Sequence, residues 1–300
     1  MNKMKKPMLL SNDEFDLKQL DYSNMYISIK RDGVRAETTN AGIKNRSLKI
    51  LRNSKMQEYF REVFEALPGD VTLEAEIYAD GIPCRKMAGV CNSLDKDIPK
   101  GTKLYIFGIY DETADFEERM GLLHRVEDLY LSGDRYSIVF QEKIYSEFQA
   151  RAFYKGALAL GFEGAVMMDG SKKYKEGRVT INQHIGFKLK PHKEIDLKII
   201  GVTERFLNTN ESQTNELGDS FKRDTVDAKE STGIAATFIC EYKGLETKVT
   251  ITGEEDSRRE IWKNQEKYLG AYAVVKAMDY GEKDRLRHPR LVSIKLQVEK

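Results

Sequence analysis

The residues best suited to chemistry lie in the segment Lys30-Arg31-Asp32-Gly33-Val34-Arg35. A lysine amine can act as a nucleophile, but only its uncharged form attacks. A free lysine with a pKa near 10.4 is uncharged in about one part in a thousand near pH 7.5, which costs about 4 kcal/mol. Neighbouring cations such as Arg31 and Arg35 favour the neutral amine and would stabilise charge on an attacked phosphate. Taken alone, the segment also fits a surface hairpin with solvated side chains.

Further polar and aromatic motifs follow in order along the chain. Glu76 and Glu163 could supply the hard oxygen ligands that Mg²⁺ prefers. Lys188 and Lys190 are spaced by two, which on a strand would project both side chains to one face. The motifs are Asn45-Arg46-Ser47, Glu74-Ala75-Glu76, Phe107, Glu163-Gly164, Tyr174 to Arg178 and Lys188-Leu189-Lys190. Each is weak by itself, and the ordered set carries the functional interpretation.

The elements that must position these residues alternate between strands and helices. Met25, Ile27 and Ile29 fall on one face of a strand that ends at Lys30. Asp32-Gly33 then predicts a two-residue hairpin turn. The other elements predicted before residue 192 are helices over 54–67, 116–132 and 146–160 and strands over 71–78, 103–110 and 164–168.

The pattern changes after Lys190-Pro191, so we place a domain boundary near residue 192. Strands are predicted over 195–202, 235–242, 247–252 and 271–278, with a helix over 257–268. Short strands around one helix are typical of a small barrel of the OB type. Residues 207–233 are polar and exceed the usual length of an unstructured loop. We expect a surface loop that is disordered, or that orders on a large partner.

Composition narrows the class of protein. The chain has 300 residues with 49 Lys and Arg against 48 Asp and Glu, which excludes a wholly basic nucleic-acid binder but does not locate charged patches. It has no apolar run of membrane-spanning length and no signal peptide, so we expect a protein that is not secreted. Cys84, Cys91 and Cys240 fit the reducing cytoplasm of a bacterial, phage or viral host cell better than a disulfide scaffold. The four histidines lie singly along the sequence, so we do not expect a structural zinc site.

In order and spacing, the motifs resemble the covalent nucleotidyltransferases, and most closely the compact ATP-dependent DNA ligases of viral and phage type. The resemblance runs from Lys6 to the last residues. It implies an α+β protein: an adenylyltransferase domain (ATP-grasp-like) of antiparallel sheets with flanking helices over residues 1–192, then an OB-fold β-barrel over 193–300. It also implies ATP, Mg²⁺ or Mn²⁺, and nicked duplex DNA as the partner of a monomer. ATP is favoured over NAD because the sequence leaves no room for the N-terminal module of NAD-dependent ligases.

The same resemblance implies roles for individual residues. Lys30 would attack the α-phosphate of ATP to form lysyl-AMP; AMP would pass to the 5′-phosphate at a nick, and the 3′-hydroxyl would displace it. Phe107 would stack on adenine. The implied nucleotide-binding residues are Asp32, Arg35, Arg46, Glu76, Phe107, Glu163, Lys188 and Lys190, with Glu76 and Glu163 also binding metal. The implied DNA contacts are Arg178, and Lys222 and Arg223 within a clamping loop over 207–233.

Several positions depart from the family pattern. Glu74-Ala75-Glu76 replaces Asp-Gly-Glu, Asn45 replaces Ser, and Gly108 follows Phe107 where Asp is common. The C-terminal Arg-x-Asp-Lys motif is represented by Arg287-His288-Pro289, then Lys295 and Glu299-Lys300, and a lysine there lacks the bidentate fork of arginine. An RNA ligase or a GTP-dependent capping guanylyltransferase shares the motifs and is an alternative. An OB-fold nucleic-acid-binding protein with a degenerate site is the non-enzyme alternative.

Overall fold

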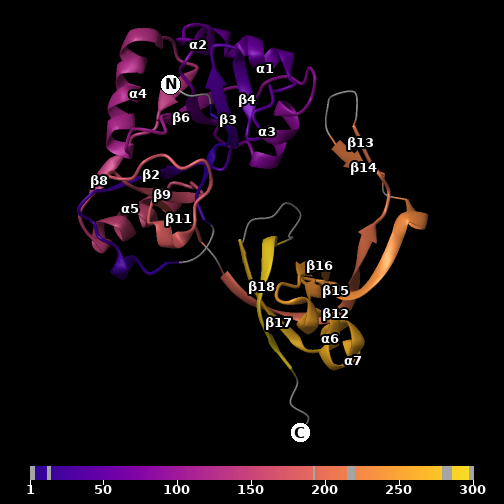
Figure 1. Cartoon of the computed structure of the whole chain (residues 1–300). Coiled ribbons are helices and arrows are strands. Elements are labelled where there is room, and N and C mark those ends of the chain that lie inside the picture. The colour runs from indigo at the N-terminus through magenta and orange to yellow at the C-terminus, as the bar shows by residue number, and fades with distance from the viewer. Residues whose placement is uncertain are drawn as a thin grey trace. The chain divides into compact units, whose positions relative to one another are not determined.

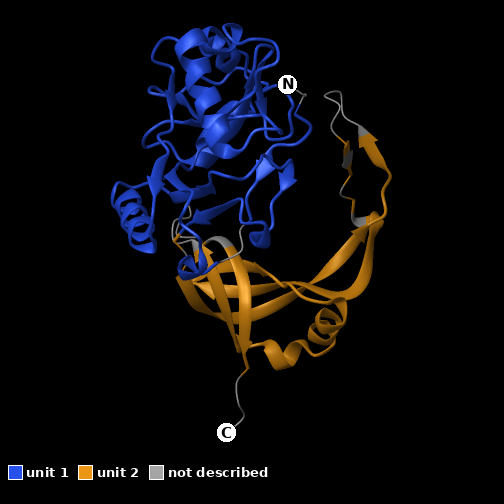
Figure 2. Cartoon of the chain, turned by 60° about the vertical axis from the view of Figure 1, so that its left-hand side comes forward, with its two compact units in different colours: residues 1–190 blue, residues 191–300 orange. Residues whose placement is uncertain are grey.

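A computed structural model describes residues 4–11, 15–191, 193–214, 220–223, 225–278 and 286–296. The chain divides into two compact units, Met1–Lys190 and Pro191–Lys300 (Figure 2). Both units combine strands with helices, which confirms the predicted α+β class (Figure 1). Among the described residues, no helix is long and apolar enough to cross a membrane.

A four-stranded antiparallel sheet of the first unit carries Lys30 at the end of a strand. Its order is β11-β9-β2-β8. Ile27 of β2 is fully buried with Met167 of β9 and Ala150 of helix α5, because alternate strand residues face the same core. The elements are β2 (Met25–Lys30), β8 (Glu142–Ile144), β9 (Gly164–Asp169), β11 (Gly186–Leu189) and α5 (Glu147–Ala159).

A five-stranded sheet forms the other half of this unit, in the order β4-β3-β5-β6-β7. Its pairs are antiparallel except for β6 and β7. The strands are β3 (Val34–Thr39), β4 (Gly42–Asn45), β5 (Leu73–Tyr78), β6 (Lys103–Ile109) and β7 (Tyr136–Ile138). Helices α1 (Ser54–Tyr59), α2 (Arg61–Glu65), α3 (Cys84–Cys91) and α4 (Phe116–Tyr130) share its apolar core. Figure 1 shows these helices around the sheet.

The helix predicted over 54–67 is interrupted in the structure. α1 ends at Tyr59 and α2 begins at Arg61, because Phe60 leaves helical geometry with a ψ of 12°. Phe60 is fully buried at this junction. Apolar periodicity reports which face is buried but does not detect such a change of direction.

The predicted hairpin at Asp32-Gly33 is wrong. β2 pairs with β8 and β9, whereas β3 pairs with β4 and β5, so the two strands that flank this turn belong to different sheets. Gly33 is required for close packing: a Cβ atom there would lie 2.4 Å from the carbonyl oxygen of Ile77. Residues 31–33 therefore carry the chain from one sheet to the other.

Short elements complete the first unit. β1 (Met8–Leu9) pairs in parallel with β10 (Gly177–Arg178), which ties the N-terminal segment to the Tyr174 to Arg178 motif. The backbone N–H of Met8 also donates to the Tyr174 hydroxyl at 2.7 Å. Two 3₁₀ helices, η1 (Leu17–Gln19) and η2 (Ile181–Gln183), lie in the connections.

Five strands of the second unit form a barrel in the order β12-β15-β16-β18-β17. β16 and β18 are paired in parallel through Thr250 and Arg290. The strands are β12 (Lys193–Asn208), β15 (Lys229–Tyr242), β16 (Leu245–Thr250), β17 (Tyr272–Met278) and β18 (Arg287–Lys295). The helix predicted over 257–268 is divided into α6 (Glu255–Lys263) and α7 (Gln265–Tyr268). His192, at the predicted boundary, lies outside the described residues.

The polar segment over 207–233 contains paired strands in its described part, which contradicts the expected disordered loop. β12 and β15 continue past the barrel and pair as far as Asn208 and Lys229. β13 (Ser212–Thr214) then pairs with β14 (Ser220–Lys222), and the 3₁₀ helix η3 (Val226–Ala228) follows. We call this extension, residues 206–231, the arm (Figure 2). Residues 215–219 and 224 lie outside the described residues.

Candidate active site

A cavity of about 620 Å³ lies in the first unit and takes its walls from both sheets. The four-stranded sheet contributes Lys30 and Lys188, and the five-stranded sheet contributes Arg35, Glu76 and Phe107. The predicted site residues that line the cavity are Lys30, Arg35, Arg46, Glu76, Phe107, Lys188 and Lys190. Residues that are scattered along the sequence thus meet at one place.

Glu163 does not itself line the cavity, but it joins two lysines that do. One carboxylate oxygen contacts the Nζ of Lys30, and the other lies 2.5 Å from the Nζ of Lys190. The side chain of Glu163 is only 5% exposed, so both ion pairs are shielded from water. Its neighbour Gly164 has a φ of +152°, and a Cβ atom there would lie 2.0 Å from the carbonyl oxygen of Leu189. Only glycine allows β9 and β11 to approach closely enough to bring Glu163 to the lysines.

Lys188 sits deeper in this basic cluster. Its Nζ donates to the carbonyl oxygen of Leu10 at 2.8 Å. Burial, together with the charges of Lys190, Lys30 and Arg178, lowers the pKa of Lys188 to about 8. A phosphate group beside these amines would relieve their mutual repulsion. The cluster is therefore built to receive an anion.

Arg35 and Glu76 occupy paired positions on β3 and β5. Burial raises the pKa of Glu76 to about 7, although the charges of Lys30 and Arg35 oppose the shift. Burial alone would lower the pKa of Arg35, but the carboxylates of Glu74 and Glu37 outweigh it and raise that pKa. The Arg35 guanidinium also lies 4.7 Å from the centre of the Phe107 ring. One face of this ring is thus covered by a cation.

Glu74 holds the Arg35 guanidinium through an ion pair, a role that the sequence did not reveal. It accepts from Arg35 Nη2 and, at 2.7 Å, from the hydroxyl of Tyr174. Arg35 Nε also donates to Glu37 at 2.8 Å. The spacing of Arg35 and Glu37 could have indicated their contact, because residues two apart on a strand project from the same face. Tyr174 reaches the site from the segment after β9; its motif was noted in the sequence, but its contact with Glu74 was not predicted.

Two departures from the family pattern meet in space. Glu74 and Gly108 are paired across β5 and β6. A Cβ atom on Gly108 would lie 2.9 Å from the second carboxylate oxygen of Glu74. The longer side chain at position 74 therefore uses the space beside a residue that has no side chain.

The remaining predicted residues of the first unit lie around this centre. Arg46 lines the cavity from a turn that Asn45 stabilises, because its side-chain oxygen accepts from the N–H groups of Ser47 and Lys49. Asp32 lies in the crossing between the sheets and does not line the cavity. Arg178 is exposed on β10.

The predicted residues of the second unit lie on the arm and the barrel. Lys222 ends β14, and its Nζ donates to the carbonyl oxygen of Asn208 at 3.2 Å. Arg223 is exposed, and its carbonyl accepts from the side chain of Asn208. Lys295 pairs with Asp196 at 2.6 Å, and Arg287 is the first residue of β18. Glu299 and Lys300 of the C-terminal motif lie outside the described residues.

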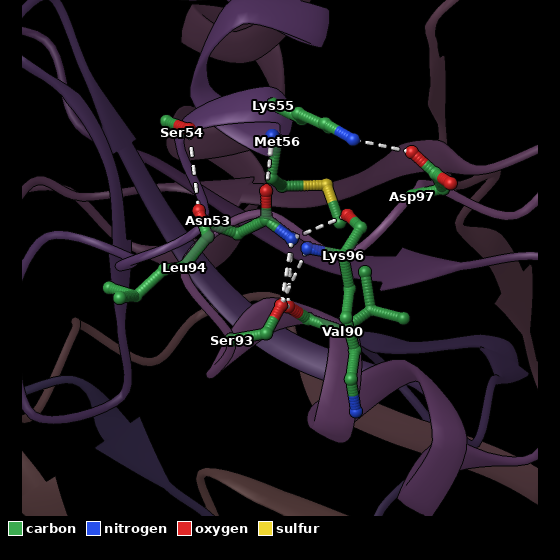
Figure 3. A network of polar contacts seen from close by, with 9 residues as sticks. All are labelled: Asn53, Ser54, Lys55, Met56, Val90, Ser93, Leu94, Lys96 and Asp97. Carbon is green, nitrogen blue, oxygen red and sulfur yellow. Dashed lines mark hydrogen bonds and ion pairs between the residues drawn. The ribbon is translucent and has the colours of Figure 1, made fainter.

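Helix α3 contributes Cys84, Ala88 and the following Asn92 to the cavity wall. Asn53 joins the start of α1 to the last turn of α3 through side-chain hydrogen bonds (Figure 3). Its buried side chain caps α1 by accepting from the N–H of Met56, and it donates to the carbonyls of Val90 and Lys96, each at 2.9 Å. Lys55 and Asp97 add an exposed ion pair of 2.6 Å.

The site fits a divalent cation that is shared with a substrate. Among the described residues, no group of three or more His, Cys, Asp or Glu could hold a metal ion by itself. Glu76 and Glu163 provide two carboxylates on facing sheets beside Lys30. Mg²⁺ is commonly bound by one or two carboxylates together with substrate phosphates and water. The donor set therefore suits Mg²⁺ or Mn²⁺ bound with a nucleotide.

Comparison with solved structures gives the fold. The chain is similar to a Chlorella virus DNA ligase-adenylate at 21% identity and a TM-score of 0.55, covering 99% of this chain and 100% of that one. It is also similar to a Lig E DNA ligase at 13% identity and a TM-score of 0.73, covering 98% and 100%. The chain has the DNA-ligase fold. The ligase domain of M. tuberculosis LigD matches at 15% identity and a TM-score of 0.50, covering 97% and 94%.

Sequence comparisons add no relative. A scan against protein-family models finds no match, and a search of curated proteins finds none. At these identities the likeness establishes the fold alone. The chemistry has to be argued from the site itself.

Proposed function

We propose that the protein is an ATP-dependent DNA ligase that seals 5′-phosphate/3′-hydroxyl nicks in duplex DNA through lysyl-AMP and adenylated DNA. One observation carries the proposal: Lys30, Glu163 and Lys190 meet at a cavity whose other wall presents Glu76 and Arg35. A protein that only bound nucleic acid would have no need for a lysine and carboxylates arranged in this way. The DNA-ligase fold supports the same conclusion.

In the first step, the Lys30 nitrogen attacks the α-phosphorus of ATP. An N–P bond forms, the bond from that phosphorus to the pyrophosphate oxygen breaks, and the amine loses a proton. Lys188 and Lys190 flank the nucleophile and would stabilise charge on the α-phosphate. Mg²⁺ held by Glu76 and Glu163 would neutralise further phosphate charge. ATP phosphates would also compete with Glu163 for the two lysines that it now pairs.

The five-stranded sheet would hold the nucleoside. Arg35 covers one face of the Phe107 ring, and a purine can stack on the other face. Arg35 and Glu76 are adjacent across β3 and β5, where both can reach ribose hydroxyls. The ion pairs of Arg35 with Glu37 and Glu74 fix its orientation before the nucleotide binds.

The later steps use DNA. AMP passes from Lys30 to the 5′-phosphate at the nick, and the 3′-hydroxyl then attacks this phosphate and releases AMP. We assign phosphate contacts to Arg46, which lines the cavity, and to Arg178, which is exposed. We assign the arm, with Lys222 and Arg223, to the DNA clamp, since paired strands with exposed basic residues can track a duplex backbone.

The test is to incubate the protein with a divalent metal and ATP, GTP or NAD, and to measure its intact mass. We expect an AMP adduct from ATP that is absent in Lys30→Ala. Lys55→Ala is the matched control, because Lys55 is an exposed lysine on α1 that pairs with Asp97. An adduct from GTP alone would refute the proposal. Sealing assays on nicked DNA and on RNA ends then separate a DNA ligase from an RNA ligase.

A further inference from the structure

Arg31 lies between two aromatic rings that come from different parts of the first unit. Its guanidinium carbon is 3.9 Å from the centre of the Tyr105 ring and 5.3 Å from that of Phe162. Tyr105 belongs to β6 of the five-stranded sheet, whereas Phe162 leads into β9 of the four-stranded sheet. Arg31 therefore bridges the two sheets beside the cavity that it lines.

Each of these rings is adjacent to one of the two candidate metal-binding carboxylates. Tyr105 is the cross-strand partner of Glu76, so their side chains lie side by side on one face. Phe162 is the residue before Glu163, whose backbone N–H donates to the carbonyl oxygen of Lys30 at 3.1 Å. Through these two rings, Arg31 is therefore linked to the backbone segments that carry Glu76 and Glu163.

Arg31 packs as a structural residue that holds the two sheets together. Its Nε is buried and has no hydrogen-bond partner among the described residues. A buried donor without a partner costs free energy, and stacking of a planar guanidinium on aromatic faces is the interaction that offsets it. Tyr78 packs edge-on against Tyr105, with ring centres 5.7 Å apart, and so limits the movement of that ring.

We propose that Arg31 is a positioning residue that fixes the separation of the Glu76 and Glu163 carboxylates and thereby the affinity of the site for a divalent cation. The inference rests on the proposed function, because it takes these two carboxylates as the metal ligands. Mg²⁺ demands near-ideal octahedral geometry, so a loosened ligand pair loses affinity. Residues that orient metal ligands change metal affinity by about 10- to 100-fold when they are replaced.

Metal binding can be measured without catalysis. Mn²⁺ is titrated into the protein together with an ATP analogue that has a methylene group between its α- and β-phosphorus atoms, and free Mn²⁺ is followed by electron paramagnetic resonance. We expect Arg31→Ala to raise the Mn²⁺ midpoint on the order of tenfold. The affinity for the analogue without a divalent ion should stay the same. Arg31→Lys should not restore the midpoint, because an ammonium group cannot stack as a planar fork does.

Variants of Tyr105 test the same stacking contact from the side of the aromatic ring. Tyr105→Ala should raise the Mn²⁺ midpoint in the same direction, and Tyr105→Phe, which keeps the ring, should not. Arg61→Ala, at an exposed arginine on α2, is the matched control. These comparisons remain informative if one variant folds poorly, since Tyr105→Phe and Arg31→Lys change little volume.

Two outcomes would overturn the inference. An unchanged Mn²⁺ midpoint in Arg31→Ala would do so, and so would a loss of analogue affinity in the absence of metal, which would make Arg31 a direct phosphate contact. The wild-type protein distinguishes this failure from failure of the proposed function. If the wild type forms lysyl-AMP while the Arg31→Ala midpoint is unshifted, only the role of Arg31 is refuted; if the wild type forms no adduct, the ligase proposal itself fails.

Discussion

Replacing Glu76 with glutamine should stabilise the first unit while it removes activity. Burial raises the pKa of the Glu76 carboxyl from its ordinary value of 4.5 to about 7. An acid with a raised pKa in the folded state destabilises the fold as the pH rises through this interval. The cost is nearly absent below the unfolded-state pKa and is complete above the folded-state pKa. Glutamine keeps the shape of the side chain and never carries this charge.

The magnitude follows from the shift. At about 1.4 kcal/mol for each pH unit between the two pKa values, the charged carboxylate destabilises the folded first unit by about 3 kcal/mol. Partial exposure of the side chain reduces the expected gain for Glu76→Gln at pH 8 to about 2 kcal/mol. At pH 5 most of the gain should be absent. Lysyl-AMP formation should fall at both pH values, because the carboxylate is assigned to ribose and metal.

The assay must report on the first unit. The sequence has one tryptophan, Trp262, which lies in the second unit, so its fluorescence would follow the wrong part of the chain. Amide hydrogen exchange of peptides from β5 and β6 measures local opening free energies instead. Glu62→Gln, on the exposed face of α2, is the control and should change these free energies by less than about 0.5 kcal/mol. Equal exchange in Glu76→Gln and wild type at pH 8 would refute the reasoning.

Three further changes test other parts of the structure. Gly33→Ala should destabilise β5 by about 1 to 3 kcal/mol in the same exchange assay, because its Cβ would clash with the Ile77 carbonyl oxygen; Gly89→Ala, where a Cβ meets nothing within 4 Å, should not. Asn53→Ala should cost about 2 to 4 kcal/mol, since it removes a helix cap and unpairs buried carbonyls, and protection of α3 unchanged from wild type would contradict this. Replacing Lys222 and Arg223 together with alanine should remove about two phosphate contacts. The slope of the logarithm of the binding constant for nicked duplex against the logarithm of the salt concentration should become shallower by about two, and an identical slope would exclude the arm as a clamp.

Local patterns predicted the elements whose side-chain periodicity matches their burial. The strand Met25–Lys30 is confirmed, as are helices near the predicted ranges 116–132 and 146–160. The last two begin after capping residues, Asp115 and Ser146, whose side chains accept from the first turn. These signals are local, so a single sequence is sufficient to read them.

Strand pairing was beyond local reasoning. Asp32-Gly33 has the composition of a hairpin, but β2 finds its partner in β9, where Lys30 pairs with Gly164. β18 was not among the predicted strands, and it contains Pro289. The structure places this proline at an irregularity between the pairs Lys276–Arg290 and Met278–Arg287, where a missing N–H is tolerated. Polar composition likewise concealed the arm, whose strands pair with each other and have no apolar core face to mark them.

The same limits apply to the candidate site. Its charged residues could be named because few other roles explain a lysine, two carboxylates and a lysine pair in this order. The supporting contacts could not be predicted, although Glu74, Tyr174 and Arg31 lie within the motifs, since they act through contacts between sheets that sequence spacing does not encode. A residue type suggests chemistry, whereas its support depends on tertiary packing.

The spacing of Lys30 and Arg35 has a structural cause that the hairpin interpretation concealed. Lys30 is the last residue of β2 and Arg35 is the second residue of β3, so the proposed nucleophile and the arginine proposed to bind the nucleoside lie on different sheets. The crossing between them is three residues long and passes directly beneath the Ile77 carbonyl, where only glycine fits. A longer crossing would leave Lys30 with Glu163 and Arg35 paired with Glu76, but it would no longer fix the distance between these two pairs. The motif is therefore a short covalent link that sets two halves of one site against each other.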